Sequence, residues 1–496
     1  YEDDLPLLFD EFNKIKSGEI TEHSLHYRWL DRQHNPVWVN CRGDVILDEF
    51  NKPLYLIGCV NEIGKRQKAD NISGLLREPC LEEYVSSKSK NNITGYFMQI
   101  GIDDFDEING RFGLKCGDEI LKQFSMCMQS CINENQKIYE LGNGRFIIMD
   151  LANHSKEDIL ELYDELKKSV EVALEENVYR VVYTISVGIV EIDKEMKDYD
   201  TLIKYSDFAL NEAKKKGKNS CYFFTQDKYK QFIRRREIRV ELQNAVDHNF
   251  KNFDVYYQPI IDIHTRNLIG AEALMRFKMK RNEQIEFISP AEFIPILEES
   301  GLIIPAGRWI LRQAVACCKK WQEFIPEFKV NVNLSYVQII KSKILDEIKQ
   351  ALKDFNLKPA LLGIEVTESG YLENTYHYKK LWSSLKEEGI TLILDDYGTG
   401  YSNAYRLSDL TPHYIKIDRV LTQKALSSNY ERSILIYIIE MAHSLKLNVC
   451  IEGVETEEEL HKVLEMGSDF IQGFYYSKPL PFNEITDYLK NFKKII

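Results

Sequence analysis

The chain has 496 residues, which is enough for roughly three domains of ordinary size. With 44% hydrophobic and 28% charged residues, its composition is that of a soluble globular protein, and no apolar stretch approaches the roughly 20 residues that span a bilayer. The net charge of −13 argues against non-specific binding to a nucleic-acid polymer.

The first 62 residues predict a short amphipathic helix followed by an antiparallel meander. The helix is expected over residues 5–15. Strand-like runs follow at residues 23–30, 37–47 and 54–60, and the turns between them contain Pro36 and Pro53. This segment reads as a small α+β unit.

Residues 66–224 predict a mixed α/β domain, because strand and helix patterns alternate along them. Strands are expected at residues 95–102, 145–151 and 178–192, and helices at residues 117–131, 156–175 and 201–216.

Residues 225–250 predict a linker helix, with the charged helical pattern spanning residues 226–249. It contains Arg234, Arg235 and Arg236. A basic run of this kind is either a solvated helix face or a site for a polyanion, and the sequence leaves both interpretations open.

Residues 251–496 alternate strand and helix signals, which predicts a TIM-type (β/α)8 barrel. Eight strands are expected at residues 255–261, 269–276, 329–334, 362–366, 391–394, 414–417, 448–451 and 470–473.

Polar side chains recur at or near the ends of these barrel strands, where the active sites of such barrels are built. Asp395 and Asp396 are adjacent, and two neighbouring carboxylates repel each other unless a cation shares them. A single strand-end acid is usually a cap or turn residue, but a series of them predicts a site for two Mg²⁺ or Mn²⁺ ions that hydrolyses a phosphodiester. The series is Glu272, Asn333, Glu365, Asp395, Asp396, Lys416, Glu452 and Gln472.

In order and spacing, six separated motifs within residues 237–485 resemble the EAL family of cyclic-di-GMP phosphodiesterases, which have a TIM-like barrel. The motifs are Glu272-Ala273-Leu274-Met275-Arg276, Asn333-Leu334-Ser335, Glu365-Val366-Thr367-Glu368, the run from Asp395 to Ser402, Lys416-Ile417-Asp418 and Glu452-Gly453-Val454-Glu455-Thr456, with Gln472-Gly473 after them.

The resemblance implies a role for each matching residue. One metal ion would be held by Glu272, Asn333, Glu365 and Asp395, and the other by Asp395, Asp396 and Glu452. Lys416 would position or deprotonate the attacking water with help from Gln472, and Glu368 would anchor the loop after Asp395. Arg276 would meet a substrate phosphate, and Gln258 would lie near the substrate.

The chain departs from the family pattern at a few places. Phe277 stands where Trp is common, and Tyr397 where Phe is common. The loop ending at residues 403–405 reads Asn-Ala-Tyr instead of two small residues and Leu, which puts the level of activity in doubt.

The middle domain resembles the GGDEF family of diguanylate cyclases over residues 66–224. The matching segments are Ile102-Asp103-Asp104-Phe105-Asp106-Glu107-Ile108-Asn109, Gly117-Asp118, Thr184-Ile185-Ser186-Val187-Gly188, Ala213-Lys214 and Gly217-Lys218-Asn219. Gly101 and Arg145 stand where the family has metal-binding carboxylates, and residues 133–136 lack the R-x-x-D product site. The domain is therefore expected to have no cyclase activity.

The part of the cyclase pattern that the chain keeps includes four positions that contact the nucleotide in the family. Asn109 and Asp118 match guanine-reading positions, and Lys214 and Lys218 match phosphate contacts. Two interpretations stay open: a scaffold with no ligand, or a domain that binds GTP without converting it and so tunes the barrel.

The N-terminal segment resembles the C-terminal half of a PAS sensor domain, through Tyr27-Arg28-Trp29-Leu30, Val37-Trp38-Val39 and the run from Ile57 to Ile63. Trp29 and Trp38 are expected in a core rather than against a ligand.

The leading hypothesis is a metal-dependent cyclic-di-GMP phosphodiesterase that gives linear pGpG, works as a homodimer and is inhibited by Ca²⁺. The alternative is a non-catalytic cyclic-di-GMP receptor that signals by conformational change; a bifunctional cyclase is disfavoured by Gly101 and Arg145. The ten cysteines form no C-x-x-C pair, which favours reduced thiols in a cytoplasmic protein. A membrane anchor or sensor segment upstream of Tyr1 stays open.

Overall fold

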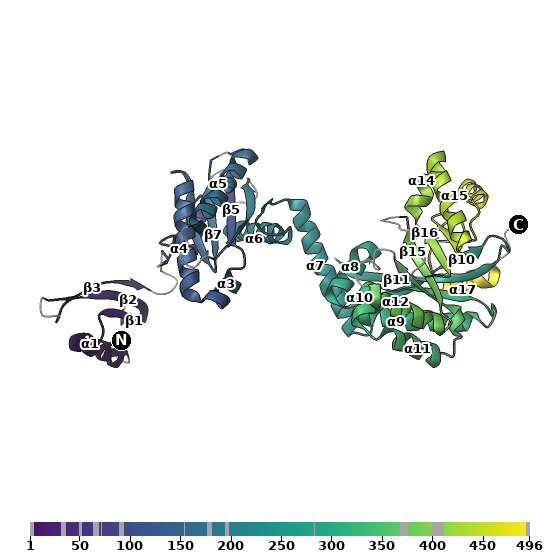
Figure 1. The fold of residues 1–496 in the computed structure, drawn as a ribbon, viewed down its shortest axis with the longest axis horizontal. Helices are drawn as coiled ribbons and strands as arrows, with labels where there is room; N and C mark the ends of the chain where they lie inside the picture. Colours follow the sequence, from purple (N-terminus) through teal and green to yellow (C-terminus); the bar gives the residue numbers. More distant parts are fainter. Residues whose placement is uncertain are drawn as a thin grey trace. The chain divides into compact units, whose positions relative to one another are not determined.

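A computed structural model describes residues 4–30, 36–48, 52–62, 69–70, 72–88, 94–152, 154–175, 181–193, 198–281, 283–367, 375–398 and 411–492 (Figure 1). The chain divides into two compact units, Tyr1–Gln231 and Phe232–Ile496. None of the described helices combines the length and apolar character needed to cross a membrane.

The N-terminal segment contains helix α1 (Leu5–Ser17) and a three-stranded antiparallel sheet, as the sequence predicts. The sheet order is β1 (Glu22–Leu30), β2 (Pro36–Leu47) and β3 (Pro53–Glu62). The expected core position of Trp29 is wrong, because its side chain is 48% exposed. The described part of this segment buries only Ile15, Tyr27 and Val39 among its apolar side chains, so Trp29 has no layer to pack under. The side chain of Trp38 lies outside the described residues, and the PAS resemblance stays a prediction.

The middle domain is built on a six-stranded sheet with the order β4-β6-β7-β5-β8-β9, and helices pack on it (Figure 1). All three predicted helices and two of the predicted strands are confirmed, but β8 begins at Ile185 and not at residue 178. The sequence missed strand β6, which forms a hairpin with β7; Asn143 (φ 53°) and Gly144 (φ 68°) at its tip suit the tight turn. The strands are β4 (Leu76–Arg77), β5 (Gly95–Ile102), β6 (Lys137–Gly142), β7 (Arg145–Asp150), β8 (Ile185–Ile192) and β9 (Cys221–Phe223), and the helices are α2 (Glu78–Lys88), α3 (Phe105–Phe112), α4 (Leu114–Cys131), α5 (Lys156–Glu175) and α6 (Tyr199–Lys215).

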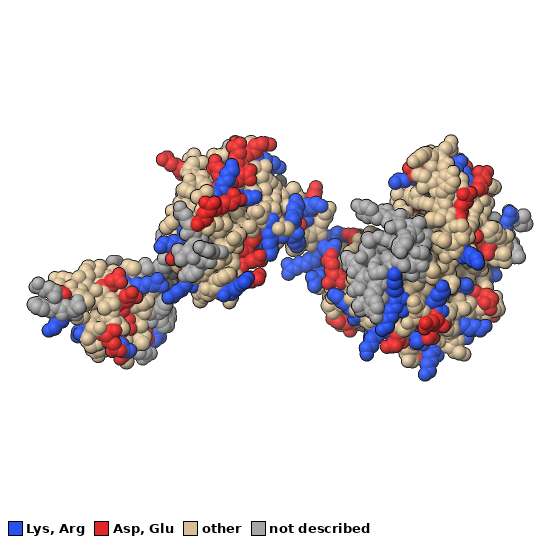
Figure 2. All heavy atoms as spheres, viewed as in Figure 1, with Lys and Arg blue, Asp and Glu red and all other residues tan. Residues whose placement is uncertain are grey.

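Helix α7 (Gln226–Asp247) confirms the predicted linker helix. The Arg234 guanidinium lies 2.6 Å from a carboxylate oxygen of Glu292 and 2.8 Å from one of Glu286, and Arg235 lies 2.6 Å from Glu299. Acidic and basic side chains are mixed over the visible faces in Figure 2. Because two of the three arginines already have acidic partners, the basic run is a helix face within the fold rather than a site for a polyanion.

The second unit is a closed eight-stranded barrel, and all eight predicted strands are present. One expectation needs correction: the strands are not all parallel, because β10 runs antiparallel to both of its barrel neighbours, β11 and β18. Strand β11 also continues beyond the barrel and pairs with the extra strand β12. The strands are β10 (Phe253–Asp262), β11 (Leu268–Arg281), β12 (Gln284–Ile288), β13 (Lys329–Asn333), β14 (Leu362–Thr367), β15 (Thr391–Tyr397), β16 (Tyr414–Ile417), β17 (Asn448–Glu452), β18 (Phe470–Gln472) and β19 (Leu480–Pro481).

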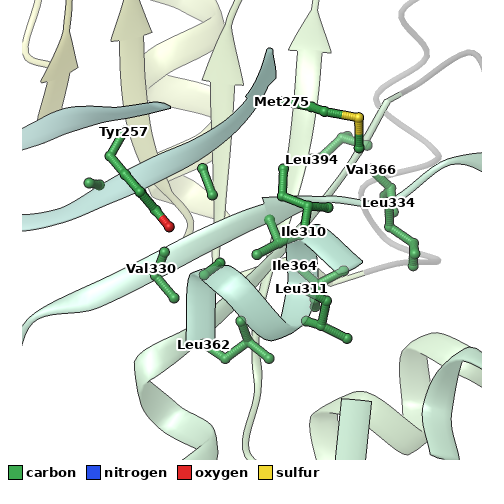
Figure 3. Packing of buried hydrophobic residues seen from close by; sticks show 14 of the residues in the cluster. Tyr257, Met275, Ile310, Leu311, Val330, Leu334, Leu362, Ile364, Val366 and Leu394 are labelled. Carbon is green, nitrogen blue, oxygen red and sulfur yellow. The ribbon is translucent and has the colours of Figure 1, made fainter. Parts of the chain in front are cut away.

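Helices cover the outside of this barrel, and apolar strand residues face them (Figure 3). On β14, Leu362, Ile364 and Val366 belong to one buried cluster with Ile310 and Leu311 of α9. Because side chains on a strand alternate between its two faces, the residues between these apolar positions point into the barrel. The helices are α8 (Pro290–Ser300), α9 (Ile303–Trp321), α10 (Tyr336–Lys341), α11 (Ile344–Asp354), α12 (Thr375–Glu387), α14 (Arg419–Ser427), α15 (Asn429–Ser444), α16 (Glu457–Glu465) and α17 (Phe482–Asn491).

Candidate active site

The inward positions of the barrel strands are apolar at one end and polar at the other. At one end of the interior, Ile260 of antiparallel β10 forms a small buried cluster with Ile393, Tyr414 and Cys450 of the parallel strands. Toward the other end, the inward residues are charged or carry amides. Strand alternation therefore brings the polar series of the sequence onto one end of the barrel interior.

Lys416 is the centre of this polar cluster, and its side chain is 1% exposed. Its ammonium nitrogen lies 2.6 Å from a carboxylate oxygen of Glu452, 2.8 Å from Glu272, 2.9 Å from Glu365 and 3.5 Å from Asp395. One buried cation thus faces four carboxylates. If all four are ionised, the cluster carries a large excess of negative charge.

Amide side chains hold the carboxylates in place. Gln472 donates to Glu272 at 2.7 Å and to the side-chain oxygen of Gln258 at 3.1 Å. Asn333 donates to the other oxygen of Glu272 at 2.6 Å. The orientation of the Glu272 carboxylate is therefore fixed by more than its contact with Lys416.

Two residues of this network were missed from the sequence. Asn331 donates to Glu365 at 2.8 Å and to the hydroxyl of Tyr414 at 2.5 Å. Both residues occupy inward strand positions two residues before a predicted site residue, Asn333 or Lys416. That alternation is the signal that could have identified them.

Burial strongly shifts the pKa values of the acidic side chains in this cluster. Burial together with the neighbouring Glu272 raises the pKa of Glu365 well above its usual range. Burial raises the pKa of Glu452 to about 8, although Lys416 opposes this shift. For Lys416, burial alone would lower the pKa, but the surrounding carboxylates raise it well above its usual range. The lysine therefore stays charged, and Glu365 and Glu452 bind protons more tightly than usual. Glu272 differs: burial raises its pKa, but Lys416 and the hydrogen bonds from Gln472 and Asn333 outweigh that effect and lower it.

Asp396 has an unusual backbone conformation, with φ 56°. Regular alternation would turn its side chain away from Asp395, but both residues line the same cavity. The β15–β16 pairing also shifts register between Leu394 and Tyr397. Burial, with Asp395 next to it, raises the pKa of Asp396 to about 6. A strained backbone at this position is typical of a functional site.

The donor set fits hard divalent cations. Glu272, Glu365 and Asp395 each offer a carboxylate oxygen, and these oxygens lie within 4.8 Å of one another. Asn333 adds an amide beside Glu272, and Asp396 and Glu452 add carboxylates around the same cavity. Oxygen ligands of this kind suit Mg²⁺ or Mn²⁺.

Two cavities adjoin this cluster. One, of about 310 Å³, is lined by Gln258, Lys416 and Phe474 among others. The other, of about 790 Å³, is lined by Arg276 and Asn333, and both cavities share Asp395 and Asp396. The Arg276 guanidinium lies over the ring of Tyr256 at 5.5 Å, and burial lowers its pKa. The structure thus gathers every predicted barrel residue around one mouth, except Glu368, which lies outside the described residues. Glu272 is not at a strand end as expected, because β11 runs on to Arg281.

The predicted nucleotide residues of the middle domain are arranged differently. Asn109 lies against Gly117, next to Asp118, so close that a Cβ on Gly117 would be 1.9 Å from its side-chain oxygen. Lys218 contacts both carboxylate oxygens of Asp104, at 2.7 and 2.8 Å. Lys218 therefore already has an acidic partner, which a phosphate at this position would lie beside.

The two middle-domain positions at which the resemblance expects metal-binding carboxylates are neighbours. Gly101 and Arg145 are directly paired across β5 and β7. A Cβ on Gly101 would lie 3.2 Å from the Lys214 ammonium nitrogen, and the Arg145 guanidinium lies 3.5 Å from a carboxylate oxygen of Asp207. Two cationic side chains thus occupy the region where carboxylates would hold a metal.

Comparison with known proteins divides the chain in the same way. The family model described as EAL domain matches residues 239–479, and the one described as Diguanylate cyclase, GGDEF domain matches residues 68–220. The chain is 31% identical over 403 residues to "Signaling protein YkoW" of Bacillus subtilis (strain 168), covering 80% of this chain and 49% of that protein. It is 27% identical over 464 residues to "Cyclic di-GMP phosphodiesterase PdeR" of Escherichia coli (strain K12), covering 93% of this chain and 68% of that protein. The chain therefore spans about half to two thirds of the length of these relatives.

Among solved structures, "PaMucR Phosphodiesterase, c-di-GMP complex" is 28% identical with a TM-score of 0.47. The match covers 50% of this chain and 99% of that chain.

Proposed function

Because the chain contains a GGDEF domain followed by an EAL domain, we propose that its barrel hydrolyses cyclic-di-GMP to linear pGpG with two Mg²⁺ or Mn²⁺ ions. The observation that carries this proposal is the buried cluster in which Glu272, Glu365 and Asp395 bring carboxylate oxygens within 4.8 Å of one another. The name of the relative PdeR, a cyclic di-GMP phosphodiesterase, supports the same substrate.

The chain's own residues supply binding and orientation. When bound, the two cations lower the pKa of an attacking water and stabilise negative charge on the phosphate oxygens. Glu272, Asn333, Glu365 and Asp395 would hold one ion, and Asp395, Asp396 and Glu452 the other.

Lys416 would position the attacking water or help to deprotonate it. Burial lowers the pKa of its ammonium group, but the surrounding carboxylates raise it well above the usual range, which favours the charged form that donates hydrogen bonds. Gln472 keeps Glu272 and Gln258 aligned through its two hydrogen bonds. Arg276 would meet a substrate phosphate from the adjoining cavity, and Glu368 would anchor the loop after Asp395.

The test is product analysis with cyclic-di-GMP in Mg²⁺, Mn²⁺, Ca²⁺ or chelator. We expect pGpG with Mg²⁺ and Mn²⁺ only, because the larger Ca²⁺ fits a fixed two-ion geometry poorly. Asp396→Asn separates the enzyme from the receptor alternative: an enzyme loses turnover at least about 10²-fold while still binding the dinucleotide. A wild-type chain that binds cyclic-di-GMP but never converts it would establish the receptor instead.

We further propose that the middle domain has no cyclase activity and regulates or supports the barrel. The side-chain oxygen of Asn109 has no hydrogen-bond partner among the described residues, which supports the GTP-binding interpretation; the Lys218–Asp104 contact supports the scaffold interpretation. Titration with GTP decides between them. Heat of binding that Asp118→Ala weakens supports a GTP site, and neither heat nor a change in phosphodiesterase rate supports a scaffold.

The homodimer is also a proposal. Light scattering coupled to gel filtration tests it, and a mass of one chain at micromolar concentration would reject it.

A further inference from the structure

A third cavity lies at the other end of the barrel. Its volume is about 400 Å³, and several of its lining residues open parallel strands: Lys329 in β13, Thr391 in β15, Asn448 in β17 and Phe470 in β18. The predicted catalytic residues lie further along the same strands. This cavity is therefore separate from the candidate active site.

Its lining is cationic. Lys329, Lys386, Lys446 and His413 line it, and no described lining residue is acidic. Lys386 donates to the hydroxyl of Thr411 at 3.0 Å. None of the three lysines forms an ion pair with a carboxylate in the described part of the chain. Positive charge is thus concentrated here, and none of the described acidic side chains neutralises it.

A simpler explanation covers part of this arrangement. Lys386 lies in the last turn of α12, and Lys446 follows α15, so each offsets the negative end of a helix dipole. That effect does not account for Lys329, which opens a strand, or for the convergence of all three lysines on one cavity.

His413 adds a neutral hydrogen-bond donor. Its Nδ1 accepts a hydrogen bond from the backbone N–H of Leu392 at 2.9 Å, so in the neutral ring the proton is on Nε2. Partial loss of hydration, together with the nearby Lys386, lowers its pKa. The ring is therefore uncharged at neutral pH and can donate through Nε2.

The rest of the lining is mixed. Ile260, Ile269 and Phe470 are apolar, and the hydroxyl of Tyr414 already accepts from Asn331. The uncharged polar lining residues are Asn331, Thr391, Thr411 and Asn448. The charge of the cavity therefore comes from its lysines, and the uncharged polar side chains can add hydrogen bonds to a bound anion.

We propose that this cavity is a binding site for a small phosphate-bearing anion. Three ammonium groups and one N–H donor match the charge and the acceptors of a phosphate dianion. A concave site of this volume admits a small molecule and not a polymer.

The experiment measures phosphate binding by the full chain, with metal removed by chelator and ionic strength held constant with chloride. Inorganic phosphate and pyrophosphate are titrated by calorimetry, and the His413 ring is followed by NMR. We expect saturable binding, a rise in the pKa of His413 on binding, and an affinity about tenfold weaker in Lys386→Gln and in Lys446→Gln, close to 1.4 kcal/mol each.

The matched control is Lys353→Gln. Lys353 also lies in the last turn of a helix, α11, but does not line the cavity, so its removal should leave phosphate affinity unchanged. A further variant, Lys214→Gln, tests whether phosphate binds instead at the cationic region of the middle domain.

Several results would overturn the proposal. These are no saturable phosphate binding by the wild type, equal affinity in the wild type and both cavity variants, or a loss that follows Lys214→Gln instead. Circular dichroism confirms folding, and Lys329→Gln replaces any variant that does not fold.

Discussion

The two domains that resemble nucleotide enzymes differ in fold and in the charges that line the matching positions. In the barrel, carboxylates surround one buried lysine, Lys416, and their excess negative charge suits added cations. In the middle domain, Gly101 and Arg145 are paired across two strands, and the Lys214 ammonium group fills the space beside Gly101. The comparison teaches that a fold resemblance sets where a site lies, whereas the charges at that place decide what it can bind.

The largest expected effect is loss of barrel activity in Asp395→Asn. Asp395 is the residue shared by both proposed ions, so its loss should lower cyclic-di-GMP turnover by about 10³-fold. The matched control is Asp354→Asn, which removes an exposed acid paired with Arg312 at 2.6 Å and should keep wild-type turnover. Turnover of the Asp395 variant within tenfold of wild type would show that this acid is not at the chemical centre.

Lys416→Met tests how much the positive charge of this lysine stabilises the carboxylate cluster of the barrel. Removing the ammonium group that contacts Glu272, Glu365, Asp395 and Glu452 takes away its charge compensation, which should lower the free energy of unfolding by about 3–5 kcal/mol in chelator. Saturating Mg²⁺ should recover part of that loss. Urea unfolding measures it, with Lys349→Met, which breaks an exposed pair with Glu388, as the control expected to change stability by about 0–1 kcal/mol. Equal effects in the two variants would contradict the account.

The double substitution Gly101→Asp with Arg145→Glu should make this region of the middle domain negatively charged, as the barrel site is. Gly101 has no positive φ, and a new Cβ there meets only the flexible ends of Leu210 and Lys214, so the change is tolerated. In a chain whose barrel is disabled by Asp395→Asn, Mn²⁺ affinity should rise by about tenfold or more. Calorimetry measures it against the same chain with Gly101 and Arg145 intact. No gain in Mn²⁺ binding would mean that charge is not what separates the two sites.

The smallest effect concerns Glu140, a buried acid of the middle domain. Glu140 accepts a hydrogen bond from Ser73, and burial raises its pKa above the usual range. The folded state therefore binds the proton more tightly than the unfolded state, so the stability that Glu140 contributes is full at acid pH and is lost as pH rises through its raised pKa. Glu140→Gln should be more stable than wild type at pH 8, by on the order of 1 kcal/mol, and the difference should vanish toward pH 4. Unfolding curves across this range test it; a constant difference would show that the carboxyl does not titrate.

Strand periodicity and motif spacing allowed much of the barrel to be predicted. Every barrel strand is where the sequence places it, because apolar residues alternate with inward positions along each one. The direction of β10 was not predictable, since period-two alternation is the same for a strand running either way. The extension of β11 was missed for a similar reason: its pairing with β12 depends on a hairpin beyond the barrel.

The sequence predicted which residues form the site, but it did not predict which of their side chains contact one another. The positive φ of Asp396 is a backbone conformation that no residue pattern specifies for an acid. The central place of Lys416 emerges only when four strands are brought together around it. Asn331 and Tyr414 were read as ordinary strand residues, because a buried polar side chain in a short strand has no signature until its partners are known.

The most direct test of the account is electron paramagnetic resonance of Mn²⁺ bound to the barrel in the presence of cyclic-di-GMP. Two ions that share Asp395 should couple magnetically, giving the spectrum of a manganese pair in the wild type and of one isolated ion in Glu452→Gln. A wild-type chain that turns over cyclic-di-GMP with the spectrum of a single isolated ion, unchanged in Glu452→Gln, would contradict the two-cation centre.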